Sequence, residues 1–306
     1  MENYQAVFKR KEIKYLLSRE KRNALLPILE AHMEPDAFAH SSISNLYYDT
    51  PDFRMVRRSL EKPMYKEKLR LRSYGTPEDT STVFPEIKKK AMGIVYKRRI
   101  SLPYQEAVSF LSGQQIASTD TCDGTTQQIA STDMCDGTTR QILHELDWML
   151  ASYKDLAPRV FLSYERDSYK GISDPSLRLT LDQDILFRTD RLDLREGAFG
   201  EAILLPDQTL MEVKISNAAP LWLAQALSEI GIFPVSFSKY GRAYERICRD
   251  PRWRKEMNGH TEIDAHTKIN EHAKIDAHTK INGHAEIDAH TKINEHAKEM
   301  EMKRYA

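Results

Sequence analysis

The chain has 306 residues with 45 basic and 45 acidic side chains, so its formal net charge is zero. A hydrophobic content of 41% can fill a sizeable core, which excludes a disordered chain, and the length allows one large domain or two ordinary ones. No apolar run approaches the ~18 residues of a membrane span, and the N-terminal residues lack the apolar stretch of a signal peptide. We therefore expect a cytoplasmic, soluble protein.

Taken from the N-terminus, the sequence first predicts a helix over residues 18–34, where a serine cap precedes apolar residues at helical spacing. Most later segments alternate with a period of two residues, which is typical of strands. The predicted strands cover residues 43–48, 64–74, 83–90, 94–102, 159–166, 177–186 and 209–215. Further helices are predicted over residues 103–111, 141–153 and 219–230. Many strands with few helices favour an antiparallel barrel or sandwich.

Two segments interrupt this pattern with internal repeats. Residues 114–126 and 127–139 are near-identical copies rich in Ser, Thr, Asp and Gly, as expected of a duplicated loop. Between residues 263 and 298 a unit of the type IDAHTKINEHAK occurs three times, with a partial copy, NGHTE, before it. Together these copies hold seven of the ten histidines. Metal capture by these histidines is one interpretation. Copies this similar, with no aromatic residue among them, favour a solvated appendage instead.

Removing the repeats changes the charge balance. The tail, residues 258–306, has seven basic against nine acidic residues, and residues 112–140 have one against four. The remaining body therefore carries a net charge of +5. We expect one domain over residues 1–257, with the repeat insert 114–139 inside it, followed by a tail that is disordered or loosely helical.

Charged residues alternate along four of the predicted strands. The first such strand carries on one face Lys66, Lys68, Arg70 and Arg72. The charged faces of the other three carry Glu86 with Lys88 and Lys90, Arg178 with Asp182 and Asp184, and Glu212 with Lys214. One interpretation is a solvated outer face. The other is a closed barrel with its polar faces inward, in which stacked cations attract a polyanion and the carboxylates hold a divalent cation.

At these residues the chain resembles the VTC domain. This is the polyphosphate polymerase domain of the vacuolar transporter chaperone complex and its bacterial relatives, within the triphosphate tunnel metalloenzyme superfamily. The resemblance runs over about residues 8–247 through the ordered motifs FKRKEIKYLLS, LYYDTPD, EKLRLRSYG, EIKKKAMGIVYKRR, HELDW, PRVFLSYERDSY, LRLTLDQDI, MEVKIS and FSKYGRAY. It implies an α+β fold, namely an antiparallel eight-stranded tunnel β-barrel with flanking helices, whose bore holds a nucleoside triphosphate or polyphosphate.

The resemblance also implies roles for particular residues. The cations of the catalytic centre would be Arg70, Arg72, Lys88, Arg166 and Arg178. The other residues expected to bind substrate are Lys14, Lys68, Lys97, Tyr164, Ser238 and Lys239. Glu212 would bind a divalent metal, Mn²⁺ or Mg²⁺, and Glu12 would help to hold it.

The implied activity is ATP-dependent polymerisation of phosphate, with ATP and inorganic polyphosphate as partners. A phosphate oxygen is already ionised, so the reaction needs no protein nucleophile, and the sequence shows no Ser-His-Asp or Cys-His set. Hydrolysis of triphosphate or polyphosphate, and polyphosphate binding without catalysis, stay open as alternatives. Nucleic-acid binding is disfavoured, because few aromatic residues interleave with the basic strand residues. The sequence identifies no membrane partner.

Overall fold

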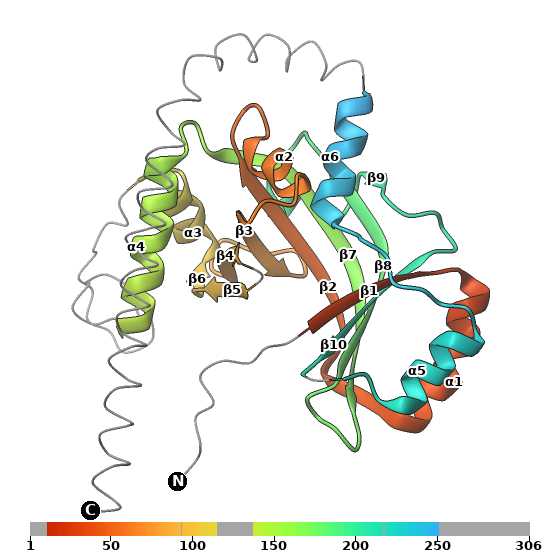
Figure 1. The fold of residues 1–306 in the computed structure, drawn as a ribbon. Coiled ribbons are helices and arrows are strands. Elements are labelled where there is room, and N and C mark those ends of the chain that lie inside the picture. The colour runs from red at the N-terminus through yellow and green to blue at the C-terminus, as the bar shows by residue number, and fades with distance from the viewer. Residues whose placement is uncertain (1–10, 93, 115–136, 217, 251–306) are drawn as a thin grey trace, which may run out of the picture. The chain divides into compact units, whose positions relative to one another are not determined.

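The computed structural model describes residues 11–92, 94–114, 137–216 and 218–250, which form an α+β fold (Figure 1). The helices are α1 (Arg19–His32), α2 (Arg54–Leu60), α3 (Tyr104–Leu111), α4 (Gly137–Ser152), α5 (Leu221–Glu229) and α6 (Lys239–Arg249), with a 3₁₀ turn at Leu194–Glu196. The strands are β1 (Lys11–Leu17), β2 (Met33–Asp49), β3 (Tyr65–Tyr74), β4 (Thr82–Ala91), β5 (Ile94–Arg99), β6 (Leu102–Pro103), β7 (Ala157–Gly171), β8 (Arg178–Arg188), β9 (Glu201–Ala202) and β10 (Thr209–Ile215).

Two predicted features of the chain fall largely outside this description. Residues 115–136, which include most of the repeat insert, and the whole tail, residues 258–306, lie outside the described residues. The expected division into one domain and a tail therefore stays a prediction. Within the part of the chain that the structure describes, no helix is long and apolar enough to cross a membrane.

The helices and strands predicted from the sequence are confirmed, with different ends. Ser18 caps α1 as expected, because its hydroxyl accepts a hydrogen bond from the Lys21 amide at 3.4 Å. The strand predicted over residues 43–48 is the buried end of β2, which begins ten residues earlier, at Met33. The elements that the periodicity did not predict are β1, α2, α6 and the short strands β6 and β9.

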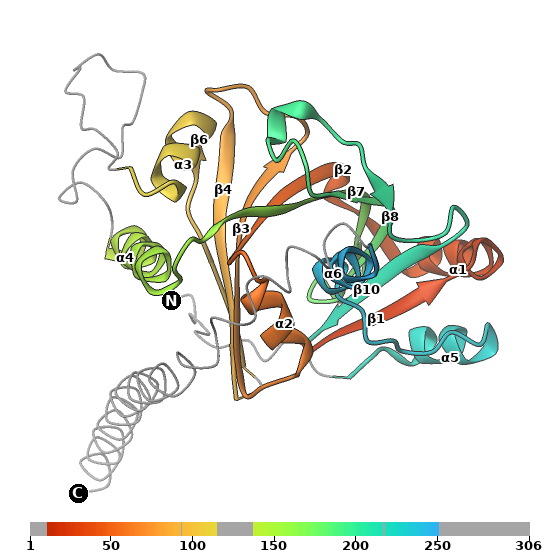
Figure 2. The ribbon, with the colours of Figure 1, turned by 90° about the horizontal axis from the view of Figure 1, so that it is seen from above.

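The main sheet follows the path β1-β10-β8-β7-β2-β3-β4-β5, with β9 paired to β8, and β6 paired to β4. Each ladder along this path is antiparallel, as expected. The α+β class and the eight strands of the path also agree with the expectation. Seen from above, these strands curve around α6, with α2 beside it (Figure 2), and both helices lie at one end of the sheet (Figure 1).

The expected closure of the barrel is not found. The two ends of the path, β1 and β5, do not pair with each other among the described residues. The reason lies at β1, because the segment before α6 occupies its outer edge. Pro234 forms a bridge with Tyr15, and the Val235 amide donates to the Lys14 carbonyl at 2.7 Å. The backbone groups that a closing strand would use at this point are therefore already bonded.

The apolar faces of the strands pack outward against the helices. One core cluster joins Leu69, Leu71 and Ile87 of β3 and β4 to Ala107 of α3 and Leu146 of α4. A second cluster joins strands β1, β8 and β10 to helices α1 and α5. Because side chains alternate along a strand, this packing turns the charged faces toward the space that the sheet surrounds. The inward arrangement of the polar faces is thus the correct one of the two interpretations.

A buried carboxylate fixes α2 and α6 at the end of the sheet. Asp49 is fully buried at the end of β2, and it accepts hydrogen bonds from the amides of Met55 and Val56 at 2.9 and 3.0 Å. These bonds satisfy the start of α2, which has no side-chain cap of its own. The Tyr240 hydroxyl of α6 donates to the same carboxylate, at Asp49 Oδ2, at 2.8 Å. One carboxylate therefore sets the positions of both helices.

Arg188 holds together the loop that follows β8. Its guanidinium is buried between the rings of Phe161 and Phe199, at 3.5 and 4.0 Å from their centroids. It donates to four backbone carbonyls, those of Arg191, Asp193, Gly197 and Phe199. A loop with this many carbonyls turned toward one cation needs that cation to satisfy them.

We expect Arg188→Met to lower the free energy of unfolding by roughly 2 kcal/mol or more, because the carbonyls would lose a charged donor inside the protein. Urea unfolding measures the change. Arg191→Met is the matched control, since Arg191 covers the same Phe199 ring from an exposed position. Equal losses in the two variants would contradict the assigned role.

Candidate functional site

Glu86 is the centre of a cation cluster on β3, β4 and β5. Its carboxylate is buried and contacts Arg70 Nη2 at 2.6 Å and Lys97 Nζ at 2.9 Å, with Arg72 Nε at 3.8 Å. Burial by itself would raise the pKa of Glu86. The three cations outweigh burial and lower this pKa to about 2. The carboxylate therefore stays ionised and offsets part of the positive charge on this wall.

Arg72 is held in one orientation by neutral partners. Its Nε donates to Asn45 Oδ1 at 3.0 Å, and its Nη2 donates to the Tyr164 hydroxyl at 3.2 Å. Asn45 is fully buried and donates its own amide to the Leu162 carbonyl at 3.0 Å. The guanidinium is thus preorganised, so little rotamer entropy is lost when it binds an anion.

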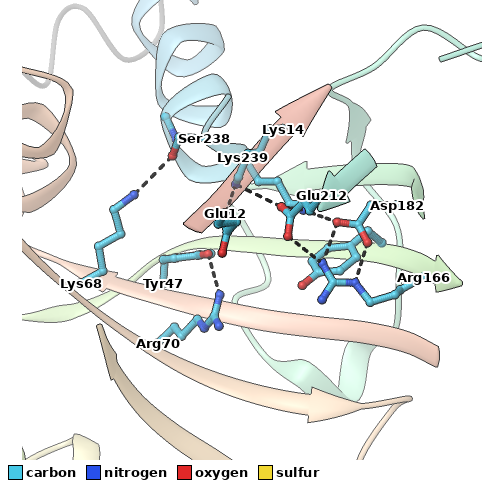
Figure 3. A network of polar contacts seen from close by, with 12 residues as sticks. Glu12, Lys14, Tyr47, Lys68, Arg70, Arg166, Asp182, Glu212, Ser238 and Lys239 are labelled. Carbon is cyan, nitrogen blue, oxygen red and sulfur yellow. Dashed lines mark hydrogen bonds and ion pairs between the residues drawn. The ribbon is translucent and has the colours of Figure 1, made fainter. Parts of the chain in front are cut away.

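Asp182 and Glu212 form a second cluster on β8 and β10 (Figure 3). Arg166 donates to both oxygens of Asp182, at 2.6 and 2.7 Å, and to Glu212 Oε2 at 3.4 Å. Lys239 of α6 binds the same two carboxylates, and it lies 3.1 Å from Glu212 Oε1. Burial alone would raise the pKa of Glu212, but Lys239, Lys14 and Arg166 together hold it well below its ordinary value.

Lys14 connects this second cluster to Glu12. Its ammonium lies 3.0 Å from Glu212 Oε1 and 3.4 Å from Glu12 Oε1. Burial raises the pKa of Glu12, but Lys88 leads the cations that overcome it and lower this pKa. Lys88 belongs to β4 and Glu12 to β1, and these two strands do not pair. Their charges nevertheless interact. The two walls therefore face the same space.

A row of lysines crosses the first wall. In the ladders Lys68 of β3 lies opposite Lys88 of β4, which lies opposite Lys97 of β5. Like charges in directly opposite positions destabilise a sheet. Burial, with Lys88 adding repulsion, lowers the pKa of Lys68 to about 8 although nearby Tyr47 raises it. Burial also lowers the pKa of Lys97 to about 8, against the attraction of Glu86. A bound polyanion would relieve this repulsion.

The start of α6 links the two walls. Its N-cap residue Ser238 accepts from the Gly241 amide at 3.1 Å and from Lys68 Nζ of β3 at 3.3 Å. The next residue, Lys239, reaches the carboxylates of β8 and β10, and its ammonium lies 4.5 Å from the centre of the Tyr164 ring. The third, Tyr240, reaches Asp49. Three consecutive residues therefore contact β3, the pair β8 and β10, and β2.

The structure brings most of the expected site residues together. Those in or beside the two clusters are Glu12, Lys14, Lys68, Arg70, Arg72, Lys88, Lys97, Tyr164, Arg166, Glu212, Ser238 and Lys239. Arg178 is the exception. It lies at the start of β8, its side chain is 44% exposed, and it pairs with Asp36 of β2. Among the described residues, no hydrogen bond or ion pair joins it to either cluster.

Four residues at the centre of the site were not singled out as site residues by the sequence: Asn45, Tyr47, Glu86 and Asp182. Alternation did place Glu86 and Asp182 on charged strand faces. It gave no reason to choose them over other carboxylates, because only the register of neighbouring strands shows which carboxylate lies among the cations. Asn45 and Tyr47 belong to the NLYYD segment of β2, whose face becomes clear only from its pairing with β3.

Comparisons with known proteins agree with this geometry. A model of the VTC domain family matches residues 9–248. Among solved structures, a candidate adenylate cyclase from Bacillus halodurans is 18% identical with a TM-score of 0.43, covering 75% of this chain and 95% of that one. The candidate adenylyl cyclase HpAC1 from Hippeastrum, described as having a dominant triphosphatase activity, is 16% identical with a TM-score of 0.41, covering 75% and 92%. A search of curated proteins gave no match. Since these TM-scores are below 0.5, the assignment rests on the domain match.

Proposed function

The chain belongs to the VTC domain family, and from this membership we propose that it is a polyphosphate polymerase that transfers the γ-phosphate of ATP to a growing polyphosphate chain. The observation that supports the proposal most is the facing pair of cation clusters. Their carboxylates neutralise only part of the charge, and the row of Lys68, Lys88 and Lys97 carries like charges side by side. Such a space favours a polyanion over any neutral ligand.

In this proposal both walls contribute residues that bind ATP. The γ-phosphate of ATP lies among Arg70, Arg72, Lys88 and Arg166, where guanidinium groups offer paired donors to its oxygens. Lys14, Lys68, Lys97, Ser238 and Lys239 bind the other phosphates, and Tyr164 orients Arg72. Arg178 contacts substrate only at one end of the space, after release from Asp36.

The transfer itself requires positioning and neutralisation of charge. An oxygen of the terminal phosphate of the chain attacks the γ-phosphorus in line, a new P–O bond forms, and the bond to the β-phosphate oxygen breaks. ADP leaves with the electron pair of that bond. Fixed cations on both walls stabilise the charge that develops on the attacking and leaving oxygens. No protein nucleophile takes part.

The family implies a divalent metal, and two carboxylates of the site fit one. Glu12 and Glu212 converge on a single cation in this structure, the Lys14 ammonium. Their hard oxygen atoms suit Mn²⁺ or Mg²⁺, ions that one or two carboxylates hold together with substrate phosphates. No group of three His, Cys, Asp or Glu side chains suited to a metal occurs among the described residues, so an all-protein cage is not expected there. When bound, the ion would neutralise phosphate charge.

The products formed from ATP and Mn²⁺ test the proposal. Purified protein is incubated with both, and polyphosphate, ADP and inorganic phosphate are resolved. Growing chains together with ADP are the expected result. Release of phosphate without chains would replace the polymerase by a triphosphatase or polyphosphatase. Tight polyphosphate binding with no product of either kind would leave a binding module.

We expect deletion of residues 258–306 to leave turnover within about twofold of the full chain, because every residue assigned to the site lies between residues 12 and 239. Initial rates of chain growth, compared at equal protein concentration, measure the effect. A large loss of turnover in a deletion variant that melts at the same temperature as the full chain would contradict the interpretation of this tail as an appendage.

A further inference from the structure

Tyr47 occupies the charged face of β2, directly opposite Arg70 of β3 in the ladder. It is only 7% exposed, and its hydroxyl accepts a hydrogen bond from Arg70 Nη1 at 3.1 Å (Figure 3). Its other cross-strand neighbour is the apolar Val160 of β7. The phenol therefore shares a face with the proposed phosphate-binding cations.

The ring of Tyr47 cannot easily turn away from that position. It stacks on the ring of Tyr240, with centroids 4.3 Å apart and an angle of 18° between the planes. Tyr240 is itself fixed by its hydrogen bond to the buried Asp49. The start of α6 therefore supports the phenol from one side, while Arg70 contacts its oxygen atom. A side chain held in this way presents its hydroxyl in one place.

The hydroxyl proton of Tyr47 has no acceptor among the described residues. The charged groups that act on it most strongly come from β3 and are cations, namely Lys68, Arg70 and Arg72. Glu86, the carboxylate among these cations, is engaged by Arg70. On the α6 side Tyr240 offers only its ring, because its own hydroxyl donates to Asp49. A buried hydroxyl with a free proton normally points to an acceptor that is yet to bind.

The geometry points to Tyr47 as a substrate-contacting residue, whose hydroxyl accepts from Arg70 and donates its own proton to an oxygen of the bound phosphoanion. This inference rests on the proposed function, since it requires a phosphoanion between the two walls. A neutral donor at this point adds a hydrogen bond to the anion without adding repulsion to the neighbouring cations.

The ionisation of Tyr47 supplies a way to observe the contact. Burial would raise the pKa of this phenol, but Arg70, Lys68 and Arg72 overcome burial and lower the pKa to about 8. Below that pH the phenol keeps its proton and can donate, and above it the phenolate repels phosphate. A bound phosphoanion must therefore raise the pKa. Lys68 and Lys97 lose their protons in the same range. The pH dependence of tripolyphosphate affinity consequently cannot show which of these three groups is responsible, whereas tyrosinate absorbance reports on tyrosine alone.

The experiment titrates tyrosinate absorbance in the full chain, with and without inorganic tripolyphosphate, in the absence of metal. We expect a first absorbance step near pH 8 that saturating tripolyphosphate moves to higher pH. Tyr47→Phe should lack this step and bind tripolyphosphate roughly tenfold more weakly at pH 7. Tyr48→Phe is the matched control, because Tyr48 lies on the opposite face of the same strand and burial raises its pKa. This control should behave as the unsubstituted protein does.

Two results would overturn the inference: a step near pH 8 that persists in Tyr47→Phe, or a step in the unsubstituted protein that tripolyphosphate does not move. If Tyr47→Phe does not fold, the second measurement still decides, because it uses the natural chain. Failure of the proposed function would give a different result. If tripolyphosphate shifts the absorbance step but the protein forms no polyphosphate from ATP, the contact of Tyr47 with the phosphoanion stands and the polymerase activity is rejected.

Discussion

Glu86→Gln is expected to lower the free energy of unfolding by about 3 kcal/mol at neutral pH, because it removes the only carboxylate that contacts Arg70, Arg72 and Lys97 within the described residues. Glutamine keeps the shape of the side chain and loses its charge. The largest part of the loss comes from Arg70 and Arg72, whose side chains are only 20% and 7% exposed. Lys97 contributes less, since it is 44% exposed and better solvated.

The pH dependence of this effect has a definite sign. Glu86 has a pKa of about 2 in the folded chain against an ordinary 4.5. The stability that its ionised form contributes is therefore present above about pH 4.5 and is lost as the pH falls toward 2. Urea unfolding at a series of pH values should show the difference between the two proteins shrinking across that window. A difference that stays constant down to pH 2 would contradict the ion-pair origin.

A phosphoanion should partly rescue the variant. Glu86→Gln leaves one more uncompensated positive charge in the site, so tripolyphosphate should raise its melting temperature more than that of the unsubstituted protein. Glu145→Gln is the matched control. Glu145 also pairs with two cations, Lys89 and Arg98, at 3.0 and 3.1 Å, but on the outer face of the same hairpin. The Glu145→Gln variant should be less stable, but tripolyphosphate should raise its melting temperature no more than that of the unsubstituted protein.

Local pattern was sufficient to predict the main strands other than β1, and the strand faces that carry charge. Period-two alternation in YKEKLRLR separates Leu69 and Leu71 from Arg70 and Arg72 whatever the neighbouring strands are. The same is true of Glu212 and Lys214 on β10. The cationic faces follow from such patterns, because each depends on residues within one strand. The α+β tunnel fold was implied by the resemblance to the VTC domain, since alternation alone left a barrel and a sandwich open.

Features that depend on contacts between distant segments could not be predicted in this way. The open edge of the sheet results from Pro234 and Val235 lying along β1, and nothing in residues 232–237 predicts that placement. Helix α6 is different, because Tyr240, Ala243, Tyr244 and Ile247 recur at helical spacing after Ser238, so its sequence does contain a helix signal. A Cβ at Gly241 would lie 2.9 Å from Leu60 Cδ2 of α2 and 3.1 Å from Ser238 Cβ, so a larger residue there would displace these side chains.

The partners of the charged residues were the least predictable part of the site. The resemblance to the VTC domain assigned both Arg166 and Arg178 to the bore, and nothing in the local pattern distinguished them. Arg166 meets the fully buried Asp182, whereas Arg178 meets Asp36 on the long exposed part of β2. Which of the two arginines joins the centre thus depends on how far β2 extends before its predicted start at residue 43.

Arg70→Ala is expected to reduce turnover of ATP by at least roughly 10²-fold, because the variant loses a guanidinium placed to stabilise charge at the transferred phosphate. It also frees Glu86 from its closest cation and removes the hydrogen bond to Tyr47. Arg98→Ala is the matched control, since Arg98 pairs with Glu145 on the outer face. Initial rates at saturating ATP measure the effect, and equal activity in both variants would reject the assignment of Arg70.

Glu212→Gln is expected to abolish turnover as well, and the reason can be resolved by metal binding. Two explanations compete, because Glu212 contacts Lys14, Arg166 and Lys239 and is also the carboxylate proposed to hold the metal. If its role is only to neutralise these cations, the variant should unfold more easily and should bind Mn²⁺ with tripolyphosphate as tightly as the unsubstituted protein does. If Glu212 holds the metal with Glu12, Mn²⁺ binding should weaken by roughly tenfold or more, because the site keeps only one carboxylate. Calorimetric titration of Mn²⁺ into the tripolyphosphate complex distinguishes the two, and full activity in the variant would reject both.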